Sequence, residues 1–557
     1  MSRPTPDPVN RREFLGMGGL ALGGLGLAGT TAARAADGTV VRGEVTDAAT
    51  GKPISCRVYV EGEDGTWHFP RSEAKGGSAV EYRKQRPDNP RSVEMHTTLS
   101  AHPFLVTLPL GRYTFTVERG KEHLPETQVV TVGKDPVDLR FKLKRWIDMA
   151  ARGWYSGETH VHRDAEELPT LMLAEDLNVT FPLSYWVTEA FASPKTARKG
   201  PFQGVDARAI PVDPTHVIYP LNTEYELFTV EKKPHTLGAF FALNHRTVLD
   251  TGAPPVRPIA ERVHKEGGLI ELDKHNWPWS MALVPVMQVD LFELANNHVW
   301  RTEFAFGRFG EPAPEYMKVE HDRNGFTERG WLDYGFQNYY ALLNCGFRLR
   351  PTAGTASGVH PVPLGFGRVY VHCPDGFGYD AWVRGLDRGE SFVTTGPMLL
   401  VRVNGKTPGA TFQPDEGKQE HRVTGEALSP LPLDRVELVV NGAVARAIRP
   451  ANRPRDEGGY VSTIDERLML EGSAWLAIRC SEALPNNRIR FAHTAPWHVR
   501  VPGRPLRPRA EEIDFLIRRV EEQLARSKDV LPPAALDEYR DALKVYRDIK
   551  KSAGGGQ

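Results

Sequence analysis

Two histidines, His160 and His162, flank a single valine in the segment YSGETHVHRD. If this segment is a strand, the alternation of side chains places both imidazole rings on one face, where they can bind one metal ion. The chain has 18 histidines among 557 residues, so roughly half an H-x-H motif is expected by chance. The pair is a candidate metal motif, with two ordinary strand histidines as the alternative, and other residues must decide between them.

Four apolar, strand-like segments further along the chain also end in polar side chains. They are NTEYELF with Glu224 and Glu226, LDKHNWPW with Asp273 and His275, VDLFELANNHVW with Glu293 and His298, and LNCGFRLRPTAGTASG, which ends at Gly358. In α/β barrels, chemistry is built at the carboxyl ends of the strands. Histidines and carboxylates at successive strand ends can therefore converge on one centre if the strands close into a barrel.

The elements that must position these residues belong to several domains, because a single core rarely exceeds about 250–300 residues. Residues 39–143 alternate apolar and polar side chains and predict strands, except for a polar stretch at 62–100 that we expect to be an insertion or an extended loop. From about residue 154 to about residue 396, short apolar runs alternate with helical segments, as in βα units. Residues 400–505 predict strands again. The helical pair that follows is expected to pack on the body of the protein, with an oligomer contact as the alternative.

The composition is that of a soluble globular protein, with 25% charged and 40% hydrophobic residues. Lys+Arg and Asp+Glu number 70 each, so there is no electrostatic reason to expect nucleic acid or an anionic membrane as a partner. The four cysteines form no C-x-x-C motif. We expect them to be buried free thiols, with a Cys345–Cys373 disulfide as the alternative.

The N-terminus contains paired arginines, Arg11 and Arg12, before a mildly apolar stretch and the sequence ARA. Residues 1–35 resemble a twin-arginine signal peptide with cleavage after Ala35. A transmembrane anchor is the alternative, but the apolar run is short and rich in glycine. The sequence therefore predicts the twin-arginine translocase as a partner during export, a periplasmic or secreted location, and no membrane span after cleavage.

The pattern G-x-V-x-D-x-x-T-G-x-P from Gly43 to Pro53, followed by LPLGRYTFTV, resembles the carboxypeptidase regulatory-like β-sandwich. Modules of this kind usually support or present another domain, and we assign this one no chemistry.

The central part resembles the CehA/McbA-type (carbaryl-hydrolase-like) metallohydrolases of the polymerase and histidinol phosphatase (PHP) superfamily. The resemblance lies in GETHVHRDAEELPTLMLAEDLNV, NTEYE, HKEGGLIELDKHNWPW, DLFELANNH, LNCGFRLRPTAGTASG and LDRGESFVTTGPML, which follow one another in family order across roughly 250 residues. It implies a distorted (β/α)7 barrel with metal at the carboxyl ends of its strands. Carried over position by position, the implied metal ligands are His160, His162, Glu224 and His275.

With this resemblance, the expected architecture is a multidomain chain. Its parts are a signal peptide (1–35), a regulatory-like β-sandwich (39–145), a PHP-like barrel (150–400), a second β-sandwich (401–505) and a helical hairpin (508–551).

The chain departs from the superfamily at two metal motifs. The acidic motif after the first βα unit falls at Ser184-Tyr185-Trp186, and the late Ser-Asp-x-His motif falls where Ala356 and Gly358 stand. Alanine and glycine side chains cannot bind metal. We therefore expect a site with one divalent ion, or a reduced site completed by His298 or His360, with zinc favoured and manganese or iron as alternatives.

Further roles are assigned to polar and aromatic residues near the expected ligands. His298 or Asp273 is expected to carry a proton to the leaving group. The expected substrate contacts are Trp277, Asn296, Asn297 and Thr355.

These observations predict an exported metal-dependent hydrolase that cleaves an ester, carbamate or phosphoester bond of a small molecule through a metal-bound hydroxide. The alternative is a non-catalytic binding protein of the cell envelope with a degenerate barrel, which the residues Ala356 and Gly358 favour. The retained set of His160, His162, Glu224 and His275 favours the enzyme, because a decaying site is expected to lose its metal-binding histidines too.

Overall fold

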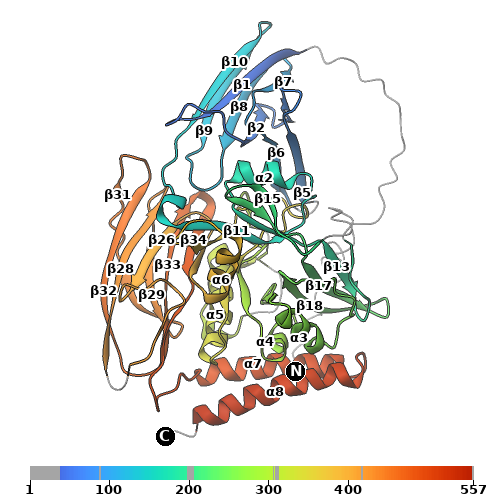
Figure 1. Cartoon of the computed structure of the whole chain (residues 1–557), viewed down its shortest axis with the longest axis vertical. Coiled ribbons are helices and arrows are strands. Elements are labelled where there is room, and N and C mark those ends of the chain that lie inside the picture. The colour runs from blue at the N-terminus through green and yellow to red at the C-terminus, as the bar shows by residue number, and fades with distance from the viewer. Residues whose placement is uncertain are drawn as a thin grey trace, which may run out of the picture.

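The computed structural model describes residues 38–86, 89–196, 206–304, 306–307, 313–414 and 418–554. The predicted signal peptide lies outside these ranges. Figure 1 shows the N-terminal strands at the top, the C-terminal strands on the left, the central part between them and to the right, and two long helices along the bottom. Within the described ranges, none of the helices combines the length and the apolar character that crossing a membrane requires.

The N-terminal part consists of two sheets whose buried faces form one hydrophobic cluster. The strand orders are β10-β1-β7-β4 and β5-β6-β2-β8-β9, with β3 paired to β2. The strands are β1 (Thr39–Asp47), β2 (Cys56–Gly62), β3 (Trp67–His68), β4 (Arg71–Ser72), β5 (Ala79–Arg86), β6 (Asn89–Leu99), β7 (Phe104–Leu108), β8 (Gly111–Glu118), β9 (Glu126–Val132) and β10 (Val137–Leu143). Burial alternates along β1, as the period of two predicts.

Of the two alternatives for residues 62–100, the extended loop is wrong, because β5 and β6 pair there as long antiparallel strands. Charged side chains hide the alternation in the sequence, yet Tyr82 in the middle of β5 is buried. Its hydroxyl donates a hydrogen bond to the carbonyl of His360 at 2.6 Å and accepts one from the amide of Gly358 at 2.8 Å. The hairpin therefore joins the N-terminal part to the central part.

The strands of the central part lie in two large sheets, apart from β21 and β22, which pair with each other. The first sheet has the order β15-β16-β12-β11-β24-β25 and continues through β34, β33, β29 and β30 of the C-terminal part. It therefore crosses the predicted domain boundary at residue 400. The second sheet has the order β14-β13-β17-β18-β19-β20-β23. The central strands are β11 (Trp154–Val161), β12 (Val179–Pro182), β13 (Tyr185–Glu189), β14 (Lys195–Thr196), β15 (Ile210–Asp213), β16 (His216–Ile218), β17 (Thr223–Val230), β18 (Lys233–Leu243), β19 (Leu269–Leu272), β20 (Leu291–Ala295), β21 (His321–Asp322), β22 (Gly325–Phe326), β23 (Arg350–Ala353), β24 (Arg368–His372) and β25 (Ser391–Thr394). The helices are η1 (Ala150–Arg152), α2 (Leu168–Glu175), α3 (Arg257–Lys265), α4 (Ser280–Met287), η2 (Glu315–Met317), α5 (Glu328–Asn344) and α6 (Tyr379–Arg388).

Strand and helix alternate less regularly than expected. β19, β20 and β23 are parallel, as in βα units, but β17 and β18 form an antiparallel pair. The two residues between β17 and β18, Glu231 and Lys232, both have positive φ, as a tight hairpin turn requires. The two sheets approach each other where the amide of Ala356 donates to the carbonyl of His160 and the amide of His162 donates to the carbonyl of Ser357, both at 2.9 Å. The distorted (β/α)7 barrel stays a prediction.

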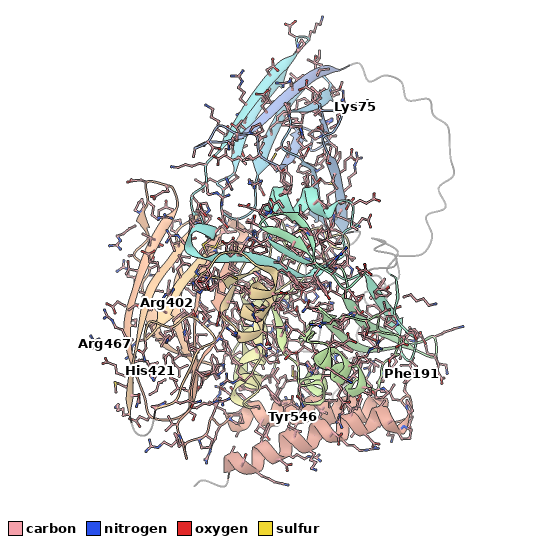
Figure 2. The ribbon with its side chains drawn as sticks, in the orientation of Figure 1. Lys75, Phe191, Arg402, His421, Arg467 and Tyr546 are labelled. Carbon is pink, nitrogen blue, oxygen red and sulfur yellow. The ribbon has the colours of Figure 1, made fainter. Side chains whose placement is uncertain are left out.

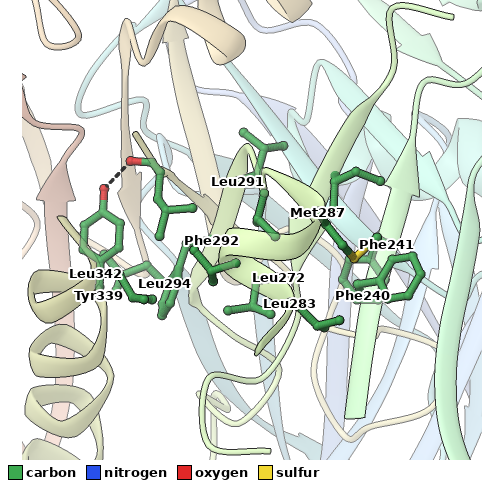
Figure 3. Packing of buried hydrophobic residues seen from close by; sticks show 14 of the residues in the cluster. Phe240, Phe241, Leu272, Leu283, Met287, Leu291, Phe292, Leu294, Tyr339 and Leu342 are labelled. Atoms are coloured by element: carbon green, nitrogen blue, oxygen red, sulfur yellow. Dashed lines mark hydrogen bonds between the residues drawn. The ribbon is translucent and has the colours of Figure 1, made fainter. Parts of the chain in front are cut away.

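The largest core lies in this central part (Figure 3). Phenylalanines of β18 and leucines of β19 and β20 pack against α4 and α5; the side chains drawn include Phe240, Phe241, Leu272, Leu283, Met287, Leu291, Phe292, Leu294, Tyr339 and Leu342. Tyr339 buries its ring and donates its hydroxyl to the carbonyl of Leu349 at 2.9 Å. This packing holds β19 and β20 side by side, and both strands carry residues of the site.

The C-terminal part packs the sheet β26-β28-β32-β31 against the extension of the first central sheet. Its elements are β26 (Met398–Val403), β27 (Thr411–Phe412), β28 (Gln419–Ser429), β29 (Arg435–Val440), β30 (Ala443–Ile448), β31 (Arg453–Pro454), β32 (Tyr460–Leu470), β33 (Ala474–Leu484), η3 (Pro485–Asn487), β34 (Arg488–Thr494), β35 (Trp497–Val499), α7 (Ala510–Ser527) and α8 (Pro533–Gly554). Tyr546 of α8 lies against the central part (Figure 2) and donates to the carbonyl of Met281 at 2.7 Å. The helical pair therefore packs on the body, as its spacing predicts. All four cysteines are free, so Cys345 and Cys373 form no disulfide.

Candidate metal centre

Strand β11 positions the paired histidines. All eight of its residues are buried between β12, which is parallel to it, and β24, which is antiparallel. His160 lies in this strand and His162 follows it, and their Nε2 atoms lie 3.2 Å apart. Alternation therefore brings the two rings together, as the sequence predicts.

Carboxylates from three other strands surround this pair. Three groups place their donor atoms within 4.8 Å of one another: His160, His162 and Glu224; His160, Asp273 and Glu293; and Glu224, Glu226 and Asp273. The groups share members, so they form one continuous centre.

Each carboxylate is brought to the centre by its place in the sheet. Glu224 and Glu226 are two residues apart on β17, Asp273 follows β19, and Glu293 lies in β20 beside it. Glu293 Oε1 lies 3.0 Å from His160 Nδ1, and Asp273 Oδ1 lies 4.0 Å from the same nitrogen. A carboxylate on one ring nitrogen fixes the tautomer and leaves the other nitrogen for a metal.

The geometry of the first group fits a divalent ion. Glu224 Oε2 lies 3.4 Å from His162 Nε2 and accepts no hydrogen bond from the described residues. Ligands at about 2.0–2.1 Å from a tetrahedral ion lie about 3.3 Å from one another, close to the 3.2 and 3.4 Å between these donor atoms. Nitrogen and carboxylate donors suit zinc, manganese or iron.

The electrostatics of the carboxylates also favour a cation. Burial raises the pKa of Glu224 well above its usual range, and the nearby Glu226 raises it further. Burial and the neighbouring Asp273 likewise raise the pKa of Glu293. A divalent ion offsets this repulsion and favours the ionised ligands. The residues therefore fit a divalent metal.

Lys274 places a positive charge inside this acidic centre. Its Nζ contacts Asp273 Oδ2 and lies 3.4 Å from Glu226 Oε1. The same atom lies 4.5 Å from the ring centroid of Trp277. Trp277, which is predicted to contact the substrate, therefore packs against Lys274.

His275 does not join the other three predicted ligands. The chain turns at His275, so strand alternation no longer directs its ring. The ring lies among Phe292, Trp331 and Tyr334, and neither of its nitrogens has a hydrogen-bond partner among the described residues. Burial lowers the pKa of His275 to about 3. A ligand role for this residue stays a prediction without geometric support.

His298 and its neighbours form the turn after β20. The His298 ring is buried, with its centroid 4.1 Å from that of Phe306, and burial lowers its pKa well below the usual range. Asn296 Oδ1 accepts the amide of His298 at 3.1 Å, and the carbonyl of Asn297 accepts the indole of Trp300. These bonds stabilise the turn, while contact of the asparagines with substrate stays a prediction.

Thr355 donates two hydrogen bonds to the buried carboxylate of Glu158. Its amide donates to Glu158 Oε1 at 2.7 Å and its hydroxyl donates to the same oxygen, which holds the segment after β23 against β11. Burial raises the pKa of Glu158 to about 8. Because the Thr355 hydroxyl is committed inside the protein, its predicted contact with substrate has no support from the geometry.

Ala356 and Gly358 occupy the positions of the late Ser-Asp-x-His motif. They lie against the backbone that carries His160 and His162. A Cβ at Gly358 would lie 2.1 Å from the carbonyl oxygen of His162, and Ala356 and Gly358 both have positive φ. A histidine could not replace Gly358 without moving the backbone.

Sequence reasoning missed several members of this centre. Asp273 was expected as a proton carrier and Glu293 and Glu226 were only noted at strand ends, yet all three lie in the groups of possible ligands. Lys274 received no role. The alternation of β17 is a signal for Glu226, but the neighbourhood of β17, β19 and β20 depends on long-range strand order.

The chain matches no protein-family model and no curated protein. Among solved structures, it is similar to a two-domain protein containing a predicted PHP-like metal-dependent phosphoesterase from Bacteroides vulgatus, at 11% identity and a TM-score of 0.26, over 61% of this chain and 94% of the other. A β-glucuronidase from Parabacteroides merdae is similar at 11% identity and a TM-score of 0.15, over 81% of this chain and 60% of the other. At such TM-scores neither likeness establishes the fold or the activity of this chain, which we infer from its own residues.

Proposed function

We propose that this protein is a metal-dependent hydrolase that cleaves an ester, carbamate or phosphoester bond of a small molecule. The observation that supports it is the first ligand group, in which two imidazole nitrogens and a carboxylate oxygen converge at 3.2 and 3.4 Å. His160, His162 and Glu224 would hold the ion, with zinc favoured and manganese or iron as alternatives. When bound, such an ion polarises a substrate oxygen and makes water more acidic.

The residues around this group would orient the ligands and move protons. Glu293 fixes the His160 ring through Nδ1, so that Nε2 faces His162. Asp273 lies beside the ligands in a contact with Lys274 and is placed to accept a proton. His298, held within an aromatic wall, is the second candidate for proton transfer.

We also propose that the chain is exported by the twin-arginine route and acts in the periplasm or outside the cell. The motif with Arg11 and Arg12 and the ARA sequence before residue 36 support this proposal. A metal loaded in the cytoplasm before translocation would suit a pathway that moves folded proteins.

A non-catalytic metal-binding protein of the cell envelope is the second candidate. The absence of metal-binding side chains at Ala356 and Gly358 favours it. It predicts bound metal without turnover.

The first experiment measures metal content by plasma mass spectrometry on the purified protein, beside a His160→Ala/His162→Ala double variant. We expect a bound divalent ion in the wild type and its loss in the variant. His321→Ala is the matched control, because His321 is exposed and outside the ligand groups, and it should keep the metal. A folded wild type that binds no zinc, manganese or iron after reconstitution would refute the proposal.

Activity then separates the two candidates. Hydrolysis of p-nitrophenyl acetate or bis-p-nitrophenyl phosphate that depends on metal and disappears in the double variant supports the enzyme. Bound metal without hydrolysis of ester, carbamate or phosphoester probes favours the binding protein.

A further inference from the structure

Lys274 is unusual among the residues of the centre because it brings a positive charge to a place where ligands for cations gather. Its side chain is 5% exposed. Its ammonium contacts Asp273 and lies 3.4 Å from Glu226, two of the three members of the group Glu224, Glu226 and Asp273. The same ammonium lies over the ring of Trp277, 4.5 Å from its centroid.

Two buried carboxylates, Glu224 and Asp273, and the half-buried Glu226 lie in mutual reach and need a compensating cation, because an unpaired buried charge is strongly destabilising. Lysine supplies one positive charge and three donors on a flexible stem. In the first group, by contrast, the two histidines add no fixed charge, and Glu224 Oε2 accepts no hydrogen bond from the described residues. The two ends of the centre therefore differ: one has a built-in cation, and the other has none.

We propose that Lys274 takes the place of a second metal ion and limits the centre to one divalent ion, held at the end formed by His160, His162 and Glu224. A further divalent ion among Glu224, Glu226 and Asp273 would lie beside the ammonium and be repelled by it. This inference rests on the proposed function, since it concerns the same centre. It gives a physical reason for one ion that does not depend on the missing late motif.

The test is the metal stoichiometry of Lys274→Met, which removes the charge and keeps an unbranched side chain of similar length. Wild type and variant are dialysed against excess Mn²⁺ or Zn²⁺, and bound metal per chain is measured by plasma mass spectrometry and calorimetric titration. We expect one equivalent in the wild type and a second equivalent in the variant. Lys274→Arg keeps the charge and should stay at one equivalent.

The outcomes separate this inference from the proposed function. A wild type without metal refutes the proposed function. A wild type with two equivalents, or a folded Lys274→Met variant that keeps one, overturns the role of Lys274 while the metal centre stands.

The variant remains informative if it does not fold without metal. A divalent ion would then replace the lost charge, so Mn²⁺ should restore the native circular dichroism and raise the melting temperature more than in the wild type. A variant that stays unfolded in saturating Mn²⁺ would overturn the proposal.

Discussion

Gly354, which follows β23, packs closely against the metal centre. A Cβ added there would lie 2.1 Å from Glu293 Oε1 and 2.2 Å from the Cβ of His160. Both distances are far shorter than the separation of about 3.5–4.0 Å at which carbon atoms attract one another. Gly354→Ala must therefore move His160, Glu293 or the backbone between them.

The size of the effect follows from this overlap. Inserting a methyl group into a packed site costs about 1–3 kcal/mol. If the displacement falls on His160 and on the carboxylate that orients it, metal affinity should fall by about 10–100-fold, the loss typical for groups that orient ligands. We expect Gly354→Ala to lower the melting temperature of the apoprotein modestly and to weaken Zn²⁺ binding much more clearly.

The assay is a competition titration of Zn²⁺ against a chromophoric chelator, with thermal unfolding in EDTA measured in parallel. Gly133→Ala is the matched control, because nothing lies within 4 Å of an added Cβ there, and it should change neither quantity. A Gly354→Ala variant that is destabilised but binds Zn²⁺ as tightly as the wild type would show that the centre does not depend on the position of His160, and the assigned ligand group would be wrong.

Three further predictions test other parts of the structure. Asp273→Asn should reduce the metal affinity more than His275→Ala, measured by the same titration, because the Asp273 carboxylate lies 4.0 Å from the ring of the ligand His160, whereas His275 lies among aromatic rings; the reverse order would show that the sequence-based ligand set is right. Glu94→Gln should destabilise the joint between the N-terminal and central parts by about 3 kcal/mol in urea unfolding, because the buried Glu94 accepts a hydrogen bond from Arg301 at 2.9 Å; an unchanged transition would contradict this. His493 has its pKa lowered by burial from 6.5 to about 3. The unfolded state therefore binds more protons, and the free energy of unfolding should fall as the pH drops below 6.5, by about 1.4 kcal/mol per pH unit for this group. His493→Gln should flatten this pH dependence, and an unchanged slope would argue against a neutral buried ring.

The parts of the site that sequence could predict are local. His160 lies in a buried strand and His162 follows it two residues later, so that the period of two places their rings together. Glu224 was implied by the family resemblance, and it lies near the start of β17. The sequence did not identify Asp273 and Glu293 as possible ligands, because their nearness to His160 depends on which strands lie side by side.

The prediction for His275 shows a second limit. A motif gives the residue type and its order in the chain, but the direction of a side chain depends on the backbone dihedral angles at that residue. Here the chain leaves the strand after Leu272 and turns at His275. The ring is directed among aromatic side chains, whereas Asp273 is directed to the centre.

The β5–β6 hairpin was missed for a related reason. Its outward side chains are charged, so the stretch looks like a loop, although Tyr82 is buried against the central part. One buried tyrosine and a few hydrogen bonds are enough to hold this hairpin against the central part. Such a contact leaves little trace in the local pattern of apolar residues.

The absence of the late Ser-Asp-x-His motif does not by itself indicate that the site has lost its function. Gly358 leaves no room for a ligand beside the backbone of His162, yet Asp273 and Glu293 bring carboxylates to His160 from neighbouring strands. Buried charges of this kind are costly, and replacing them with apolar residues is often neutral or stabilising. A scaffold without chemistry would therefore not need to keep them. Their concentration around two imidazoles is therefore better explained by a working metal centre than by the needs of the fold.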